Sequence, residues 1–216
     1  MTKKRVAVLI SGRGSNMASL IAAAARPDYP AAIVAVISNR PDAAGLTRAN
    51  EAGVAAAVVP DAGRDKPAFE AALDGRLSES DVDIICLAGF MKLLSPAFVD
   101  LWRDRILNIH PSLLPAFPGL HTHEREIAAG VKVHGCTVHF VRAEVDSGPI
   151  VAQGVVPVFP LDTADTLAAR VLAVEHRVYP LALAMVASGR ARVSGDRVTL
   201  DGGAPAGDAV LISPAP

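Results

Sequence analysis

Cysteine is scarce in this sequence, which has Cys86 and Cys136 alone among 216 residues. Each lies in an apolar run, so we interpret them as buried, reduced thiols of a cytosolic protein and exclude a disulfide framework. A long hydrophobic run is also missing, because the first apolar stretch, residues 6–10, is too short for a signal peptide or a membrane span. We therefore expect a cytoplasmic protein without a membrane partner.

The sequence also lacks an excess of either charge. The net charge is −1, and no block of Lys or Arg follows the first five residues. Proteins that bind nucleic acid usually present a basic face, so we expect no nucleic-acid partner. No repeat or linker is evident, and 51% of the residues are hydrophobic, enough for one core. We expect a single domain over residues 1–216, with a loosely ordered tail at about 202–216.

Short β-branched apolar runs alternate with longer helical patterns along the chain. Strands are expected at 6–10, 33–38, 56–59, 84–88, 106–110 and 137–141, and helices at 15–25, 44–52, 67–78, 95–101, 122–129 and 163–188. Because the strand runs are almost continuously apolar, we expect them to be covered on both faces. The pattern predicts an α/β fold, a doubly wound, mainly parallel sheet with helices on both faces. An antiparallel hairpin of residues 191–194 and 197–200 should follow.

Local signals predict where some helices begin and end. Asp42 and Ser95 are candidate N-caps, and Pro96 suits a first helical position. Pro180 lies inside the last helical pattern and lacks a backbone N–H donor. We expect it to kink or end that helix.

A glycine-rich segment, Ser11-Gly12-Arg13-Gly14-Ser15-Asn16, connects the first strand to the first helix. Glycines let the backbone approach an anion, and the N–H groups of a helix N-terminus point at it, so this segment predicts a phosphate site. The alternative is a tight turn with an N-cap. A dinucleotide site is disfavoured, because Met17 replaces the third glycine and Ser38-Asn39 replaces the acidic residue that binds a ribose.

The strand at 106–110 carries Asn108 and His110, which point to the same side of the sheet because they are two residues apart. Ligands of open parallel sheets bind beyond the carboxyl ends of the strands, where this pair should lie. An amide N–H with a protonated imidazole stabilises an oxyanion, and histidine also transfers protons near neutral pH. The alternative for a single histidine at a strand end is a packing or capping role.

Asp146, in a second loop, is placed to meet His110 and favour its charged form; the alternative is an ordinary turn residue next to Gly148-Pro149. His121 and His123, beside Glu124, have no third ligand at a recognisable spacing. We therefore expect no metal site and interpret them as polar pocket groups or helix-start residues. No role follows for His134 or His139.

The segment Asn108-Ile109-His110-Pro111-Ser112-Leu113-Leu114-Pro115, with Asp146 further along, resembles the folate-dependent formyltransferases. Three further segments narrow the resemblance to the members that act in purine biosynthesis: LAGFMKLLSPAF from Leu87, PGLHTH from Pro118 and VDSGPI from Val145. With the SGRGSN loop, the similarity covers about residues 5–200 in order. This set of motifs is highly specific.

The resemblance implies transfer of a formyl group from N10 of 10-formyltetrahydrofolate, a co-substrate, to the amine of glycinamide ribonucleotide. The catalytic residues would be Asn108, His110 and Asp146, without a metal. The ribonucleotide would be bound by Gly14, Ser15, Asn16 and Glu175. The folate would contact Lys66, Met91, Lys92, Leu93, Leu94, Asn108, Arg142, Ala143 and Glu144. A monomer or homodimer is expected.

The sequence departs from the family pattern at three positions. Lysine replaces the frequent arginine at Lys66 and Lys92, which keeps the charge and loses the planar guanidinium, and Leu172 stands where a glutamine can occur. These departures concern folate affinity more than the reaction. The Leu114-Pro115 isomer stays open.

Other functions are distinguished by features that this sequence lacks. A formyltransferase acting on tRNA should carry a further C-terminal domain and a basic surface, and a formyltetrahydrofolate hydrolase should carry an N-terminal regulatory domain. A nicotinamide oxidoreductase is disfavoured by Met17 and Asn39. A non-catalytic phosphate-binding α/β regulator would keep the glycine-rich loop without needing Asn108 beside His110.

Overall fold

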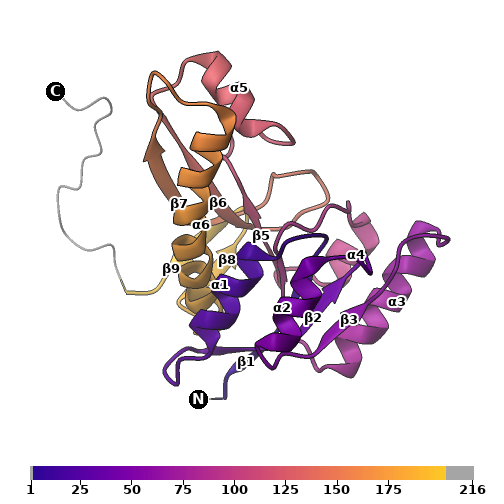
Figure 1. The fold of residues 1–216 in the computed structure, drawn as a ribbon. Helices are drawn as coiled ribbons and strands as arrows, with labels where there is room; N and C mark the ends of the chain where they lie inside the picture. Colours follow the sequence, from indigo (N-terminus) through magenta and orange to yellow (C-terminus); the bar gives the residue numbers. More distant parts are fainter. Residues whose placement is uncertain (1, 203–216) are drawn as a thin grey trace.

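A computed structural model of the chain describes residues 2–202. Its main sheet has the strand order β3-β2-β1-β4-β5-β6-β7, and β8 and β9 form a separate two-stranded sheet (Figure 1). The strands are β1 Lys4–Ile10, β2 Ala31–Ser38, β3 Ala56–Val58, β4 Ile84–Leu87, β5 Ile106–His110, β6 Val133–Phe140, β7 Ile150–Pro157, β8 Ala191–Ser194 and β9 Arg197–Leu200. The helices are α1 Ser15–Ala24, α2 Ala44–Glu51, α3 Lys66–Glu79, α4 Pro96–Leu101, α5 Thr122–Ala129 and α6 Ala164–Ala187.

Five strands of the main sheet are parallel, which confirms the predicted mainly parallel sheet. β1 pairs in parallel with β2 and β4, β2 with β3, and β4 with β5. β6 is antiparallel to β5, and β7 is antiparallel to β6. The sequence did not predict β7, because it is an edge strand in which exposed and buried residues mix and Gly154 interrupts the apolar run.

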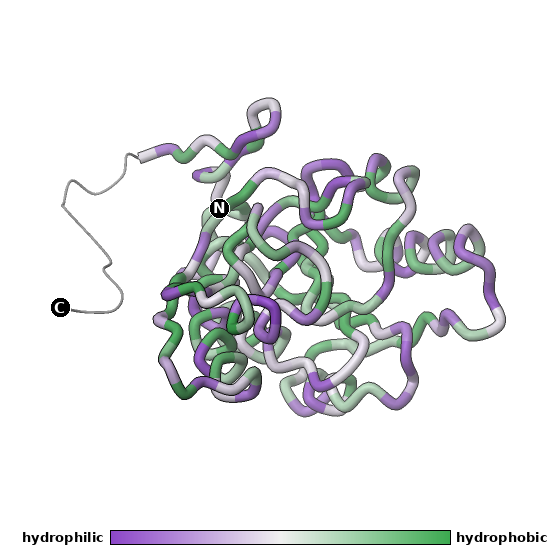
Figure 2. Tube along the Cα trace, turned by 90° about the horizontal axis from the view of Figure 1, so that it is seen from above, coloured by the Kyte–Doolittle hydropathy of each residue, from purple (hydrophilic) through white to green (hydrophobic). Residues whose placement is uncertain are grey.

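Two apolar layers cover the sheet, as its continuous hydrophobic strands require. On one face, residues of α1, α2 and α6 pack against side chains such as Val8 and Cys86. On the other face, Phe69 of α3 and Trp102, which follows α4, pack with Leu9 and their neighbours. Figure 2 shows hydrophobic segments running through the interior, while hydrophilic segments gather on the outer turns. Cys86 and Cys136 are both buried and unpaired.

The predicted helix ends are partly right. Ser95 caps α4 by accepting a hydrogen bond from the Phe98 amide at 3.1 Å, and Pro96 is the first helical residue, as predicted. Asp42 is not an N-cap. Its carboxylate instead pairs with Arg40, and Ala43 takes the cap position without a side-chain hydrogen bond.

Pro180 was expected to kink or end the last helix, and it does not end it, since α6 continues past it to Ala187. Tertiary packing outweighs the missing backbone donor, because Tyr179 and Leu183 on either side of Pro180 are fully buried. The Tyr29 hydroxyl donates a hydrogen bond to the Pro180 carbonyl at 2.7 Å. The hairpin β8–β9 has the predicted bounds.

The predicted tail lies, apart from Gly202, outside the described residues. Within residues 2–202, no helix is both long and apolar enough to cross a membrane. The Leu114-Pro115 peptide bond is cis.

The order in which the chain adds strands to the sheet reverses direction between β1 and β4. From β1 the chain proceeds outward through β2 and β3, and then returns to β4 on the other side of β1. The loops after β1 and β4 therefore leave the sheet side by side at its carboxyl edge, which is where open α/β sheets bind ligands.

Candidate active site

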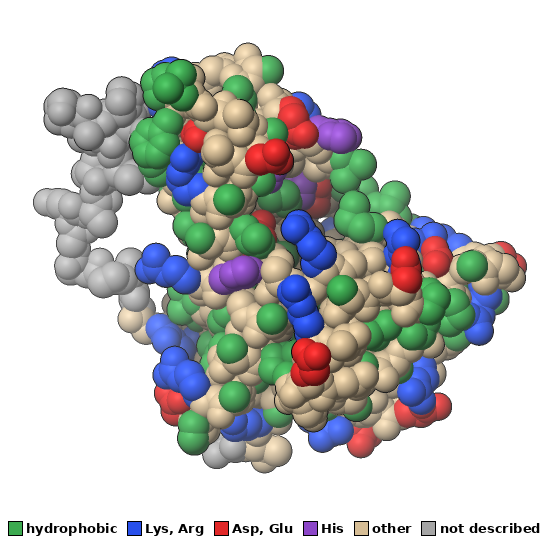
Figure 3. Space-filling view, in the orientation of Figure 1, with side chains coloured by type: hydrophobic (Ala, Val, Ile, Leu, Met, Phe, Trp, Pro, Cys, Tyr) green, Lys and Arg blue, Asp and Glu red, His purple; other side chains and the backbone are tan. Residues whose placement is uncertain are grey.

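Asn108 and His110 lie at the carboxyl end of β5, and Asp146 reaches His110 from the loop between β6 and β7. The His110 Nδ1 atom is 3.4 Å from Asp146 Oδ2, and the two side chains are 8% and 9% exposed. Figure 3 shows the surface hollowed between α5 and the body that carries α1 and α2, with histidine and acidic side chains inside. The structure thus brings together polar side chains of β5 and of the β6–β7 loop that are at least 36 residues apart in the sequence.

A short loop after the cis Pro115 forms hydrogen bonds with both His110 and Asp146. The Nε2–H group of His110 donates to the Phe117 carbonyl at 3.1 Å, and the Gly119 amide donates to Asp146 Oδ2 at 2.8 Å. Phe117 and Asp146 both have positive φ angles, 53° and 55°, which non-glycine residues rarely adopt. The backbone of this loop therefore fixes the orientation of the imidazole and of the carboxylate.

His139 orients the Asn108 amide. It lies opposite Asn108 in the β5–β6 pairing, and Asn108 Nδ2 is 3.2 Å from His139 Nε2. The His139 Nδ1–H group donates to the Phe140 carbonyl at 3.0 Å. Burial lowers the pKa of His139, so its neutral form accepts the amide hydrogen at Nε2. The sequence reasoning missed His139, since its role depends on a strand pairing that was not predicted.

His123 and His134 belong to a second group, in which His134 is buried and His123 is half-buried. His123 Nδ1 lies 2.7 Å from His134 Nε2, and the other ring nitrogen of His134 contacts the Glu126 carboxylate. Burial, with His134 as its neighbour, lowers the pKa of His123. His121 is exposed at the N-cap position of α5. Within residues 2–202, no group of three or more His, Cys, Asp or Glu residues is arranged to hold a metal ion.

The glycine-rich loop leads directly into α1, with Gly14 as its N-cap at φ 70°. A Cβ atom on Gly14 would lie 3.0 Å from the Cα of Gly45, so the loop packs tightly against the start of α2. The Gly45 amide also donates to the Gly12 carbonyl at 3.0 Å. No side chain caps α1, which leaves its first N–H groups available to a ligand.

Two buried side chains connect this loop to α6. Asn16 Nδ2 donates to Glu175 Oε2 at 2.7 Å, and burial raises the pKa of Glu175. Asn16 Oδ1 is buried and has no hydrogen-bond partner among the described residues. Asn39, at the position where a dinucleotide-binding fold has an acid, instead accepts a 2.6 Å hydrogen bond from Ser11.

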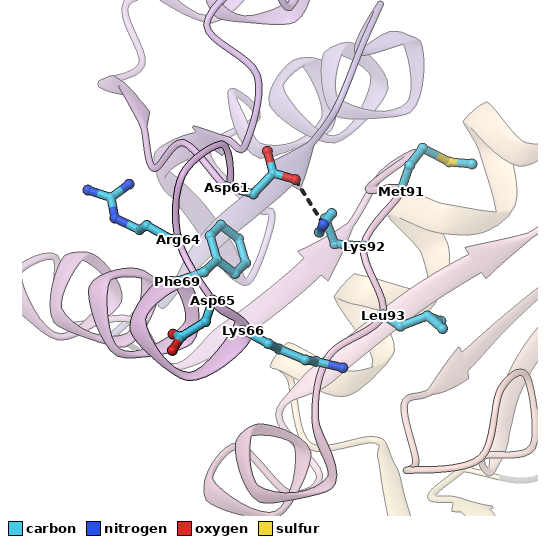
Figure 4. A pocket seen from close by; sticks show the side chains of 8 residues that line it. All are labelled: Asp61, Arg64, Asp65, Lys66, Phe69, Met91, Lys92 and Leu93. Carbon is cyan, nitrogen blue, oxygen red and sulfur yellow. Dashed lines mark ion pairs between the residues drawn. The ribbon is translucent and has the colours of Figure 1, made fainter.

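A cavity of about 350 Å³ lies between the loop before α3 and the loop after β4. Its lining residues are Asp61, Arg64, Asp65, Lys66, Phe69, Met91, Lys92 and Leu93 (Figure 4). Lys92 pairs with Asp61 at 2.8 Å, and this contact lowers the pKa of Asp61. Figure 4 shows Lys66 extending toward Leu93, while Arg64 points away from Met91 and Leu93.

Comparison with known families identifies the family of this chain. Residues 4–183 match the model of the family described as formyl transferase, which is most of the chain. The chain belongs to the formyl transferase family.

Several relatives of this formyl transferase are known. The chain is 43% identical over 198 residues to phosphoribosylglycinamide formyltransferase of Escherichia coli, covering 91% of this chain and 93% of that protein. It is 50% identical over 192 residues to the trifunctional purine biosynthetic protein adenosine-3 of Bos taurus, covering 88% of this chain. The chain spans about a fifth of that protein's length, as 19% of it is matched. The crystal structure of glycinamide ribonucleotide transformylase 1 from Symbiobacterium toebii superposes with a TM-score of 0.89 at 47% identity, covering 92% of this chain and 94% of that one.

The residues predicted for a folate site are not all gathered in one place in this formyl transferase. Lys66, Met91, Lys92 and Leu93 line the cavity of Figure 4. Leu94 instead packs inward against the apolar layer of α3 and α4. Arg142 pairs with Asp104 at 2.6 Å, and Ala143 and Glu144 are exposed in the loop that leads to Asp146.

Proposed function

We propose that this chain transfers the formyl group of 10-formyltetrahydrofolate to the amine of 5′-phosphoribosylglycinamide in purine biosynthesis. The products are formylglycinamide ribonucleotide and tetrahydrofolate. The observation that carries the proposal is the convergence of Asn108, His110 and Asp146 at the carboxyl end of β5. Further support comes from the names of relatives that match nearly their whole length, such as the Escherichia coli enzyme.

Asn108 and His110 stabilise the charge that develops when the amine attacks the formyl carbon. One N–H of the Asn108 amide is engaged by His139, so the other is left for the formyl oxygen. The second donor is the Nε2–H group of His110. In this structure it donates to the Phe117 carbonyl, and a bound substrate would take the place of that carbonyl. Donors fixed in advance in a largely buried site stabilise an oxyanion more than water does.

Proton transfer completes the reaction. The attacking amine loses one proton, and N10 of the folate gains one as the bond to the formyl carbon breaks. Asp146 faces Nδ1 of His110 at 3.4 Å and holds the ring in place for proton transfer. No covalent enzyme intermediate is needed, because no nucleophilic serine or cysteine adjoins His110 in this arrangement.

The two substrates enter from opposite sides of this centre. The phosphate binds at Gly14, Ser15 and Asn16, and Glu175 faces the ribose or glycinamide end from α6. The folate lies along residues 91–94 and 142–146, with Asn108 at its reactive end and Lys66 and Lys92 near its anionic tail. Residues 1–216 act as one formyltransferase domain in the cytoplasm, as a monomer or homodimer, without a nucleic-acid or membrane partner.

The decisive experiment measures tetrahydrofolate formation from 10-formyltetrahydrofolate, with and without glycinamide ribonucleotide. We expect turnover that requires the ribonucleotide and stops in the Asn108→Ala variant. Equal turnover without an acceptor would identify a hydrolase instead. Absence of turnover with both substrates, in folded protein, would reject the proposal.

A further inference from the structure

Arg13 lies in the middle of the glycine-rich loop and is exposed, although the residues on either side of it are largely covered. It immediately precedes Gly14, the N-cap of α1, and is therefore the cationic residue nearest in sequence to the free N–H groups of that helix. Its side chain makes no hydrogen bond or ion pair with any other described residue, so its guanidinium is available to a ligand.

Three other exposed arginines, in contrast, are each paired with an acidic neighbour. Arg26 pairs with Asp28 at 2.7 Å, Arg40 with Asp42 at 3.1 Å, and Arg76 with Glu79 at 2.6 Å. Arg13 has no acidic residue among its neighbours in the segment Ser11–Asn16. Its charge is therefore not compensated locally.

Basic side chains also gather around this loop in space. Figure 3 shows basic side chains at the edge of the hollow, in the region of the loop after β1 and α2. The basic residues of these two segments are Arg13 and Arg48, and both are exposed. The Gly12–Gly45 hydrogen bond holds the two segments together. An anion at the start of α1 is therefore attracted by the positive charge of these segments in addition to the helix dipole.

A second observation points to a ligand at the same place. Asn16, in the first turn of α1, is 9% exposed, and its Oδ1 atom has no hydrogen-bond partner among residues 2–202. Its Nδ2 atom is held by Glu175, so Oδ1 cannot turn away to find one. A buried polar atom without a partner costs free energy, which a bound substrate with a hydroxyl or N–H donor would recover.

We propose that Arg13 is a phosphate-binding residue that makes this site specific for a phosphomonoester. Its guanidinium contacts the phosphate from the solvent side, while the N–H groups at the start of α1 bind the phosphate from the protein side. The inference rests on the proposed function for the identity of the natural substrate, but the phosphate contact can be measured without it.

The chemistry of the two groups fits this arrangement. A guanidinium presents parallel N–H donors that match two phosphate oxygens, whereas an ammonium offers a single point charge. The N–H groups of a helix N-terminus bind any anion of suitable size. A cationic side chain beside them, such as Arg13, adds a preference for a dianionic phosphate. Arg13 should therefore contribute to phosphate affinity more than to the rate of the chemical step.

The experiment compares the parent enzyme with Arg13→Ala, Arg13→Lys and Arg26→Ala. The last removes an exposed arginine just beyond the other end of α1 and so matches the change in net charge. Steady-state kinetics measure kcat and KM for glycinamide ribonucleotide and for its dephosphorylated analogue, at low and high salt. Calorimetry with ribose 5-phosphate measures phosphate binding directly, and melting curves verify folding.

We expect Arg13→Ala to raise KM for the ribonucleotide about tenfold, the loss typical of a charge-assisted hydrogen bond, with little change in kcat. KM for the dephosphorylated analogue should not change, and Arg13→Lys should fall between the parent and Arg13→Ala. The dependence of KM on salt should weaken in Arg13→Ala. Arg26→Ala should behave as the parent does.

Two results separate this inference from the proposed function. If the parent turns over the ribonucleotide and Arg13→Ala has the parent's KM and ribose 5-phosphate affinity, the inference about Arg13 is wrong and the function stands. If the parent shows no turnover but binds ribose 5-phosphate about tenfold more tightly than Arg13→Ala does, the proposed function is wrong and the phosphate contact stands. An equal loss of affinity for the dephosphorylated analogue would also overturn the inference, because it would show a general effect on the site.

Discussion

At the scale of single residues, Asp146 combines a functional position with an unusual backbone. Its φ of 55° is one that asparagine and aspartate tolerate better than other non-glycine residues, and its carboxylate bridges the Gly119 amide and the His110 ring. Changing it to asparagine therefore removes the charge while preserving the shape and the hydrogen bond from Gly119.

We expect Asp146→Asn to lower kcat by at least about 100-fold, because the His110 ring loses the negative charge of the carboxylate beside it. KM for both substrates should change little, since the lost interaction acts mainly in the transition state. Asp81→Asn is a matched control, because Asp81 is exposed and also has a positive φ, 47°. Turnover of folded Asp146→Asn within a few-fold of the parent would leave Asp146 with a turn role alone.

Gly14 provides a second test at this scale. A Cβ atom there would lie 3.0 Å from the Gly45 Cα and 3.1 Å from the Met17 Cε, at a φ of 70°. We expect Gly14→Ala to lower stability by about 1–2 kcal/mol through backbone strain and to raise KM for the ribonucleotide. Gly53 has nearly the same φ, 73°, and open space around it. Gly53→Ala should therefore cause a similar strain without affecting KM, and a normal KM in folded Gly14→Ala would contradict the phosphate assignment.

The residues of the candidate site could be found in sequence only where they are close together or part of a motif. Asn108 and His110 share one strand, so their common direction follows from the two-residue spacing. His139 and Arg64 were missed for different reasons. His139 meets Asn108 through an antiparallel pairing, and Arg64 lines the cavity through the path of an irregular loop. Neither relation has a periodic signal along the chain.

At the scale of elements, the start of α3 forms one wall of the cavity beside the loop after β4. Lys66 is the first residue of α3, is exposed and extends across the cavity toward Leu93 (Figure 4). Glu70, one turn later, accepts hydrogen bonds from the backbone and hydroxyl of Ser95. This contact fixes the end of the loop that residues 91–94 form.

If Lys66 contacts the glutamate tail of the folate, Lys66→Ala should weaken folate binding modestly. An exposed ion pair contributes roughly 0–1 kcal/mol, so the affinity should fall up to about fivefold and become less sensitive to salt. Arg76→Ala, in the last turn of the same helix, is the control of equal charge. Fluorescence titration at two salt concentrations measures both effects, and identical salt slopes for parent and Lys66→Ala would exclude the contact.

The connection from β7 to α6 is held by one carboxylate. Asp162 accepts two hydrogen bonds from Arg170, at 2.8 and 2.9 Å, and one each from Phe159 and Thr166. Arg170 in turn lies over the Phe159 ring at 4.3 Å. The hydrogen bonds from Arg170 hold the pKa of Asp162 well below its usual range.

A group with a lowered pKa stabilises the fold above the pKa of the unfolded chain, and this stabilisation is lost as the pH falls below that value. We therefore expect Asp162→Asn to lower the Tm by about 2–6 °C at neutral pH. The difference from the parent should shrink as the pH falls below about 4. Asp165→Asn, an exposed acid in the first turn of α6, should have a small effect at every pH. A difference in Tm that does not depend on pH would contradict the role of the charge.

The elements that the sequence predicts well are those whose residues are buried to the same extent on both faces. The parallel strands are apolar on both faces, and their positions were predicted to within a few residues. β7 was missed because an edge strand has no single periodicity. Pro180 does not end α6, because the local effect of its missing backbone donor competes with the burial of a 24-residue helix, and the burial is larger.

At the scale of the whole molecule, the strand order joins the two proposed substrate sites. The loop after β1 carries the proposed phosphate site, and the loop after β4 carries part of the proposed folate site. Ser11 connects them, because its amide donates to the Gly89 carbonyl at 3.1 Å and its hydroxyl accepts from the Met91 amide at 2.9 Å. We therefore expect a displacement of either loop to shift the other through this buried serine.

The burial of both cysteines has a practical consequence for measuring such displacements. Burial raises the pKa of Cys86 and of Cys136 to about 12, so almost no thiolate forms at neutral pH. We expect a maleimide dye to leave the native chain unlabelled and to modify both thiols after denaturation. A cysteine introduced at exposed Leu120, beside the loop that holds His110 and Asp146, would then be the single reactive position. Its dye would report the movement of that loop against an unlabelled background, and native labelling of the parent would show that the core opens to solvent.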